Sequence, residues 1–134
     1  MIFERFFPRK SPLTGAPLNR RMKTYSAPSG YVYSYYYEGQ RRSGAGGRAA
    51  TEYVFSLSAG RAEWREITLA LPDAAIGAWQ EASGRELSAS ERYAVAKLTL
   101  FQVFDEHDVP EALPREVRIA QDAIEAIAVS LGWA

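Results

Sequence analysis

The chain contains no cysteine, only one histidine and no long hydrophobic run. The absence of cysteine excludes disulfides, thiolate catalysis and cysteine-based zinc sites, and it fits the cytoplasmic location that we expect. The single histidine, His107, excludes metal sites that need several histidines. No apolar run approaches the roughly 20 residues of a membrane span. The start, MIFERFFPRK, is too short and too charged for a signal peptide, so we expect no membrane association.

Sequence motifs that mark catalytic or cofactor sites are also missing. No serine stands in a G-x-S-x-G motif, and the glycine-rich run at 44–47 lacks the G-K-[ST] of a phosphate loop. The acidic residues at 105–111 do not follow the calcium-loop pattern; we expect Arg115 or Arg118 to pair with them, because carboxylates at the end of a helix oppose its dipole. The sequence therefore predicts no catalytic residue, no cofactor and no metal, and we expect a non-enzymatic protein.

The balance of charge is zero overall but strongly uneven along the chain. Residues 1–62 carry ten Lys and Arg against three Asp and Glu, and residues 63–134 carry six against thirteen. Such polarity indicates either a basic binding face or attraction between a basic and an acidic half, within one fold or between copies. We favour the second interpretation, because it needs no outside partner.

A chain of 134 residues predicts one domain. Residues 1–21 are expected to form an irregular arm, since four Pro and Gly residues interrupt it while three phenylalanines give it something to bury. We expect these phenylalanines, Phe3, Phe6 and Phe7, to pin the arm to the core; the alternative is an anchor on a neighbouring subunit. Residues 22–134 then form the domain itself.

Within this domain, apolar residues first recur with a period of two, as in strands, and then with the period of a helix. The predicted strands cover about 22–27, 30–38, 50–58 and 64–71, and the predicted helices cover about 72–83, 89–107 and 114–131. Short loops between sequential strands favour an antiparallel meander. The order ββββααα predicts an α+β fold, in which two to three C-terminal helices cover one face of a sheet of about four strands.

The helix over 89–107 is the longest and is expected to organise the core. Ser88 and Glu91 have the spacing of a capping box. Its apolar half is wide enough to contact both the sheet and another helix, while Val95 falls on the polar half. Lys97 is the anomaly of the apolar half. Its ammonium either reaches water along an extended stem, or is buried and holds an anionic group.

Two neighbouring features form the candidate binding surface. Alternation along the strand at 30–38 puts four tyrosines on one face: Tyr31, Tyr33, Tyr35 and Tyr37. Such a row suits a half-covered sheet, or it stacks on bases or lines a ligand cleft. The loop predicted at 39–49 is flexible and basic, with Arg41, Arg42 and Arg48.

Three hypotheses of function follow. The first is a protein-interaction module that binds another protein or itself as a homodimer, based on the charge asymmetry, the arm and a second apolar seam on the last helix. The second is binding of a polyanion or nucleic acid by the tyrosine row and the arginine loop; the neutral net charge disfavours it. The third is a small-molecule site between sheet and helices, with Lys97 and tyrosine hydroxyls as its polar groups.

Overall fold

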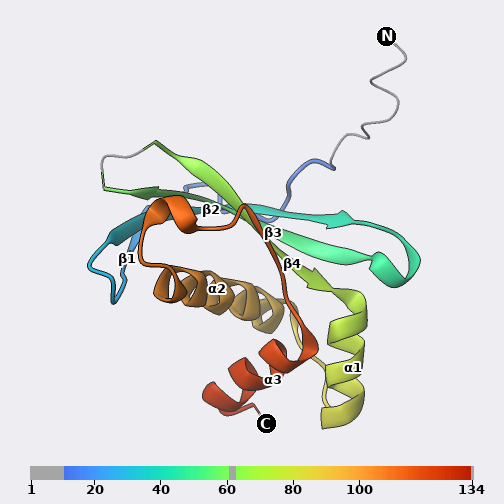
Figure 1. Cartoon of the computed structure of the whole chain (residues 1–134). Coiled ribbons are helices and arrows are strands. Elements are labelled where there is room, and N and C mark those ends of the chain that lie inside the picture. Colours follow the sequence, from blue (N-terminus) through green and yellow to red (C-terminus); the bar gives the residue numbers. More distant parts are fainter. Residues whose placement is uncertain (1–10, 61–62, 134) are drawn as a thin grey trace.

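The protein has an α+β fold in which three helices lie on one side of a mostly antiparallel sheet (Figure 1). The computed structural model describes residues 11–60 and 63–133. Its strands are β1 (Lys23–Ser26), β2 (Val32–Ser43), β3 (Ala50–Ala59), β4 (Arg65–Pro72) and β5 (Glu116–Arg118). Its helices are α1 (Asp73–Ser83), α2 (Ala89–Glu106) and α3 (Gln121–Ser130), with short 3-10 turns at η2 (Gly46–Arg48) and η3 (Pro110–Ala112). No helix in this described part is both long and apolar enough to cross a membrane.

The first four strands form the predicted meander, and the sheet order follows the chain order from β1 to β5. Tyr35 pairs with Lys23 on one side and with Leu57 on the other, and Leu57 pairs in turn with Arg65. The odd-numbered residues of β2 up to Tyr37 therefore share the face that the helices cover. The even-numbered residues point to the opposite face, as the alternation predicts.

The fifth strand corrects the prediction of four strands and of one helix over 114–131. The segment at 116–118 runs parallel to β4, and its flanks are fixed by hydrogen bonds from Thr68 N to Arg115 O (2.9 Å) and from Ile119 N to Ala70 O (2.8 Å). Only the remainder, α3, is helical. A free edge of β4 would leave a row of unpaired backbone groups, and β5 pairs with the middle of that edge, at 68–70.

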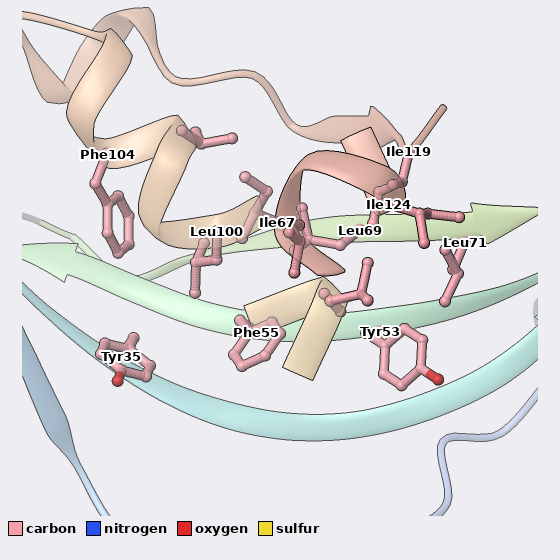
Figure 2. Packing of buried hydrophobic residues seen from close by; sticks show 14 of the residues in the cluster. Tyr35, Tyr53, Phe55, Ile67, Leu69, Leu71, Leu100, Phe104, Ile119 and Ile124 are labelled. Atoms are coloured by element: carbon pink, nitrogen blue, oxygen red, sulfur yellow. The ribbon is translucent and has the colours of Figure 1, made fainter. Parts of the chain in front are cut away.

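The core lies between the sheet and α2 and α3. Figure 2 shows Leu100 and Phe104 of α2 facing the aromatic and aliphatic side chains of the sheet, with Ile124 of α3 toward the Leu71 end of the cluster. The capping box at Ser88 is confirmed, since Ser88 Oγ accepts from Glu91 N and Glu91 accepts from Ser88 N. Val95 is fully buried rather than part of a solvated face; α2 contacts α3 as well as β4, so its buried stripe is wider than expected.

The loop predicted at 39–49 is shorter than expected, because β2 continues through a bulge between Tyr37 and Gly39 to Ser43. Gly39 has φ +125°, and a Cβ there would lie 2.7 Å from Thr14 O. This close approach allows the arm to join the sheet, with Thr14 and Gln40 exchanging backbone hydrogen bonds of 2.8 and 2.9 Å. The three phenylalanines expected to pin the arm lie outside the described residues.

Candidate functional site

The tyrosine row of β2 lies under α2 rather than open to solvent. Tyr33 and Tyr35 are buried, Tyr37 is half-buried, and only Tyr31, just before the strand, is exposed. The Tyr33 ring stacks on Phe104 with 4.2 Å between centroids and 3° between planes. Rings packed in this way are not available to stack on bases, so the row contributes to the core.

Two of the three arginines assigned to the basic loop are paired with carboxylates of the same chain. Arg41 Nε donates to Glu52 Oε1 at 2.8 Å, across the β2–β3 ladder, and both side chains are nearly buried (9% and 13% exposed). Arg42 Nη1 donates to Asp73 Oδ1 at 2.7 Å. The hydrogen bond from Arg42 lowers the pKa of Asp73. Only Arg48, in η2, is exposed without an ion pair to a described carboxylate.

A cavity of about 290 Å³ opens between the arm, β1, β2 and α2. We call it the arm pocket. It is lined by Pro17, Asn19, Arg21, Lys23, Tyr35, Tyr37 and Tyr93. One wall is cationic and another is aromatic, and no acidic residue lines it. The tyrosines arrive there because Tyr35 and Tyr37 share the helix-covered face of β2, while Tyr93 lies in the second turn of α2 above them.

Burial favours the uncharged phenols of the arm pocket and disfavours the ammonium of Lys97, which lies next to the pocket residue Lys23. Burial raises the pKa of Tyr37 strongly, with the neighbouring Tyr53 and Tyr93 adding to the shift. Burial likewise raises the pKa of Tyr93. Burial also lowers the pKa of Lys97, one turn after Tyr93, and the nearby Lys23 ammonium lowers it further. Lys97 is half-buried and its Nζ lies 5.9 Å from the centroid of the Phe101 ring.

A second surface lies on the sheet face opposite the helices. We call it the Trp64 patch. It is formed by Arg20, Tyr36, Glu38 and Trp64 and by the exposed Val32, which shares the face of β2 with Tyr36. The Tyr36 and Trp64 rings are 5.2 Å apart, and the guanidinium of Arg20 lies 4.7 Å from the Tyr36 centroid. Glu38 accepts from Arg20 and from Ser56 Oγ, both at 2.6 Å. The patch therefore combines exposed aromatic area with a fixed cation and a fixed carboxylate.

A larger cavity, of about 590 Å³, separates α1 from α3. Its buried indole, Trp79, donates from Nε1 to Glu125 Oε2 at 2.7 Å. The guanidinium of Arg85 lies 5.7 Å from the Trp133 ring. The first contact ties α1 to α3, and the second ties the segment after α1 to the segment after α3; we assign both to stability.

The acidic residues at the end of α2 are compensated differently from the prediction. Asp105 accepts a hydrogen bond from Tyr25 Oη at 2.7 Å, whereas neither Arg115 nor Arg118 forms an ion pair with a described carboxylate. Within residues 11–60 and 63–133, no group of three or more His, Asp or Glu side chains is placed to hold a metal ion.

The sequence indicated part of the arm pocket but missed the Trp64 patch. Lys97 and the tyrosine row were singled out, whereas Arg21, Lys23 and Tyr93 were not. Nothing local shows that the arm pairs with the edge of β2 or that Tyr93 of α2 lies beside it. The patch had a usable signal: Tyr36 and Trp64 both fall on the face opposite the apolar stripe of their strands. Comparison with known proteins found no matching family model, curated protein or solved structure.

Proposed function

We propose that the protein is a non-enzymatic interaction module that binds a second copy of itself through the Trp64 patch. The observation that carries this proposal is the Tyr36–Trp64 pair, in which Trp64 is 48% exposed on a sheet face that no described helix covers. Trp, Tyr and Arg are the residue types that most often dominate binding energy at protein interfaces. All three lie together here, and Val32 adds further exposed apolar surface.

Charge supports a second copy as the partner. The basic and acidic halves of the chain are joined by only one ion pair among the described residues, Arg42 with Asp73; the other three pairs lie within one half. Most basic side chains of the first half and most acidic side chains of the second half therefore form no ion pair with each other among the described residues. A two-fold axis parallel to the strands would place the basic β1–β2 side of one sheet over the β4–β5 side of the other, where Glu66 of β4 is exposed.

The patch also meets the requirement of a two-fold interface, which must be complementary to itself. It carries a cation, Arg20, and a carboxylate, Glu38, that pair within each chain, so a two-fold axis would bring two such pairs together and allow further contacts of opposite charge between the copies. Two facing sheets with strands roughly aligned bury their side chains in a layer about 10 Å thick. Tyr36 and Trp64 would lie at the centre of that layer, with the charged groups at its rim.

The test is the molar mass in solution, by light scattering and sedimentation, at about 100 μM, where a micromolar Kd gives mostly dimer. We expect a dimer that Trp64→Ser converts to monomer. Val129→Ser, on an exposed position of α3 that is distant in the fold from the patch, serves as the matched control and should stay dimeric. Raising the NaCl concentration from about 50 to about 500 mM should weaken the dimer by screening the charged rim. A wild-type chain that is monomeric at both salt concentrations would refute the proposal.

A further inference from the structure

We propose that the arm pocket is a binding site for a small phosphate monoester. Arg21 and Lys23 of its lining would neutralise the phosphate, Lys97 would add charge beside Lys23, and the tyrosines would surround the organic group. This inference is independent of self-association, because the arm pocket lies on the helix side of the sheet and the Trp64 patch lies on the other.

Positive charge at the arm pocket is not balanced by nearby carboxylates in the described part of the chain. Each ion pair among the described residues uses another cation: Arg20, Arg41, Arg42 or Arg85. Arg21, Lys23 and Lys97 therefore have no described carboxylate within 4.0 Å. Like charges held close together are unfavourable, and an anion placed between them would remove that cost.

Lys23 and Lys97 lie near each other. Lys97 lies on α2 and Lys23 on β1, and the nearby Lys23 ammonium lowers the pKa of Lys97 beyond the effect of burial. An ammonium whose pKa is lowered by burial and by a neighbouring cation regains its proton affinity when an anion binds. Binding and protonation of Lys97 are thus coupled.

The tyrosine hydroxyls of the arm pocket are available as hydrogen-bond donors. Tyr37 Oη makes a long hydrogen bond of 3.4 Å to Gln40, and the structure records no hydrogen bond for the hydroxyls of Tyr35 or Tyr93 among the described residues. Their raised pKa values, caused mainly by burial, keep these phenols protonated at neutral pH. Ammonium, guanidinium and phenol groups together offer many donors, which matches the several acceptor oxygens of a phosphate better than the two of a carboxylate.

The size and shape of the arm pocket suit a small aromatic phosphate. A cavity of about 290 Å³ is small for a drug-sized ligand and holds a phosphate with one ring. The Tyr37 and Tyr93 rings meet edge to face, with centroids 4.8 Å apart, so a planar group entering beside them finds an aromatic wall. These dimensions select a small molecule and exclude a nucleic-acid duplex.

The experiment uses the full chain with inorganic phosphate and phenyl phosphate as probes, followed by NMR of the backbone amides and lysine side chains. We expect saturable shifts at residues 17–23 and at Lys97, with a Kd of about 1 mM for phosphate and about fivefold tighter binding for phenyl phosphate because of its ring. The pKa of Lys97, followed through its side-chain resonances, should rise on binding. Equal Kd values for the two probes would overturn the role assigned to the tyrosines.

The variants distinguish a specific binding site from non-specific attraction between the anion and exposed basic side chains. Lys23→Gln and Lys97→Gln should each weaken phenyl phosphate binding by about tenfold, the usual effect of losing one charge-assisted hydrogen bond. Arg48→Gln removes the same charge from an exposed turn and should leave the Kd unchanged. Circular dichroism of each variant checks folding, and two independent lysines protect against failure of one. An equal loss in Arg48→Gln, or no shifts up to about 20 mM phosphate, would overturn the site.

The two proposals fail separately. Trp64→Ser should bind phenyl phosphate with the wild-type Kd, and Lys97→Gln should keep the wild-type molar mass. If Trp64→Ser abolished phosphate binding, the pocket assignment would be wrong, whatever the oligomeric state.

Discussion

Replacing Tyr33 by phenylalanine is expected to stabilise the protein, which is the reverse of the usual result for a buried tyrosine. The Tyr33 side chain is fully buried, and its hydroxyl has no hydrogen-bond partner among the described residues. Burial raises the pKa of this phenol, so it stays neutral at pH 7. The folded state therefore carries a polar group that has lost its water without gaining a partner.

The magnitude follows from what the substitution removes and what it keeps. An unsatisfied buried hydroxyl costs about 1–3 kcal/mol, while the ring and its stacking on Phe104 are kept. We expect the free energy of unfolding to rise by about 1 kcal/mol, at the lower end of this range, because the smaller side chain leaves a small void. For a domain of this size, this corresponds to an increase in Tm of about 3 °C.

The assay is urea unfolding of wild type and variant, followed by tryptophan fluorescence and circular dichroism at pH 7. Tyr25→Phe is the matched control, because its hydroxyl donates to Asp105 at 2.7 Å while its ring stacks on Phe101 at 4.4 Å. Losing that hydrogen bond should lower stability by about 1 kcal/mol. If Tyr33→Phe destabilises the protein as much as Tyr25→Phe does, the Tyr33 hydroxyl has a partner and the reasoning is wrong.

Three further predictions concern the core, the arm and pH. Leu100→Ala should lose about 3 kcal/mol in urea unfolding because Leu100 is fully buried, whereas Val129→Ala on the surface should change stability by less than about 0.5 kcal/mol. Gly39→Ala should cost about 2 kcal/mol in the same assay, since φ +125° and an approach of 2.7 Å to a backbone oxygen both oppose a Cβ. Asp73→Asn should lose at most about 0.5 kcal/mol at pH 7, because the pair with Arg42 is 58% and 46% exposed. The pKa of folded Asp73 is lowered, so this contribution is present above the unfolded pKa and disappears as the pH falls below about 4; an equal difference at pH 3 would contradict it.

The parts of the fold that the sequence predicted well are those in which local patterns agree with the tertiary environment. The alternation of β2, the capping box at Ser88 and the helix predicted over about 72–83, which ends before Gly84 with φ 72°, all follow from near neighbours along the chain. The β5 segment could not be predicted in this way, because three residues after Pro114 fit a helical period equally well. Its backbone pairs with β4, more than forty residues earlier, and no local pattern encodes that contact.

The residues of the candidate sites likewise divide into those that a local pattern identifies and those that only the tertiary fold brings together. Lys97 stood out because a charge on an apolar stripe is visible in the sequence alone. Its neighbour Lys23 was not identified, since their proximity depends on how β1 and the arm cross the start of the sheet. The partners of Arg41 and Arg42 were missed for a related reason: the bulge at Gly39 extends β2, which turns two supposed loop residues into members of a ladder.

The late position of β5 in the chain has a consequence for biosynthesis. The meander and α2 contain most of the core, yet the outer edge of β4 remains unpaired until residues 116–118 have left the ribosome. A nascent or truncated chain ending before them would present a strand of hydrophobic residues, with Ile67, Leu69 and Leu71 in it, as a template for wrong pairing. Premature termination in this region should therefore yield aggregates rather than a smaller folded product.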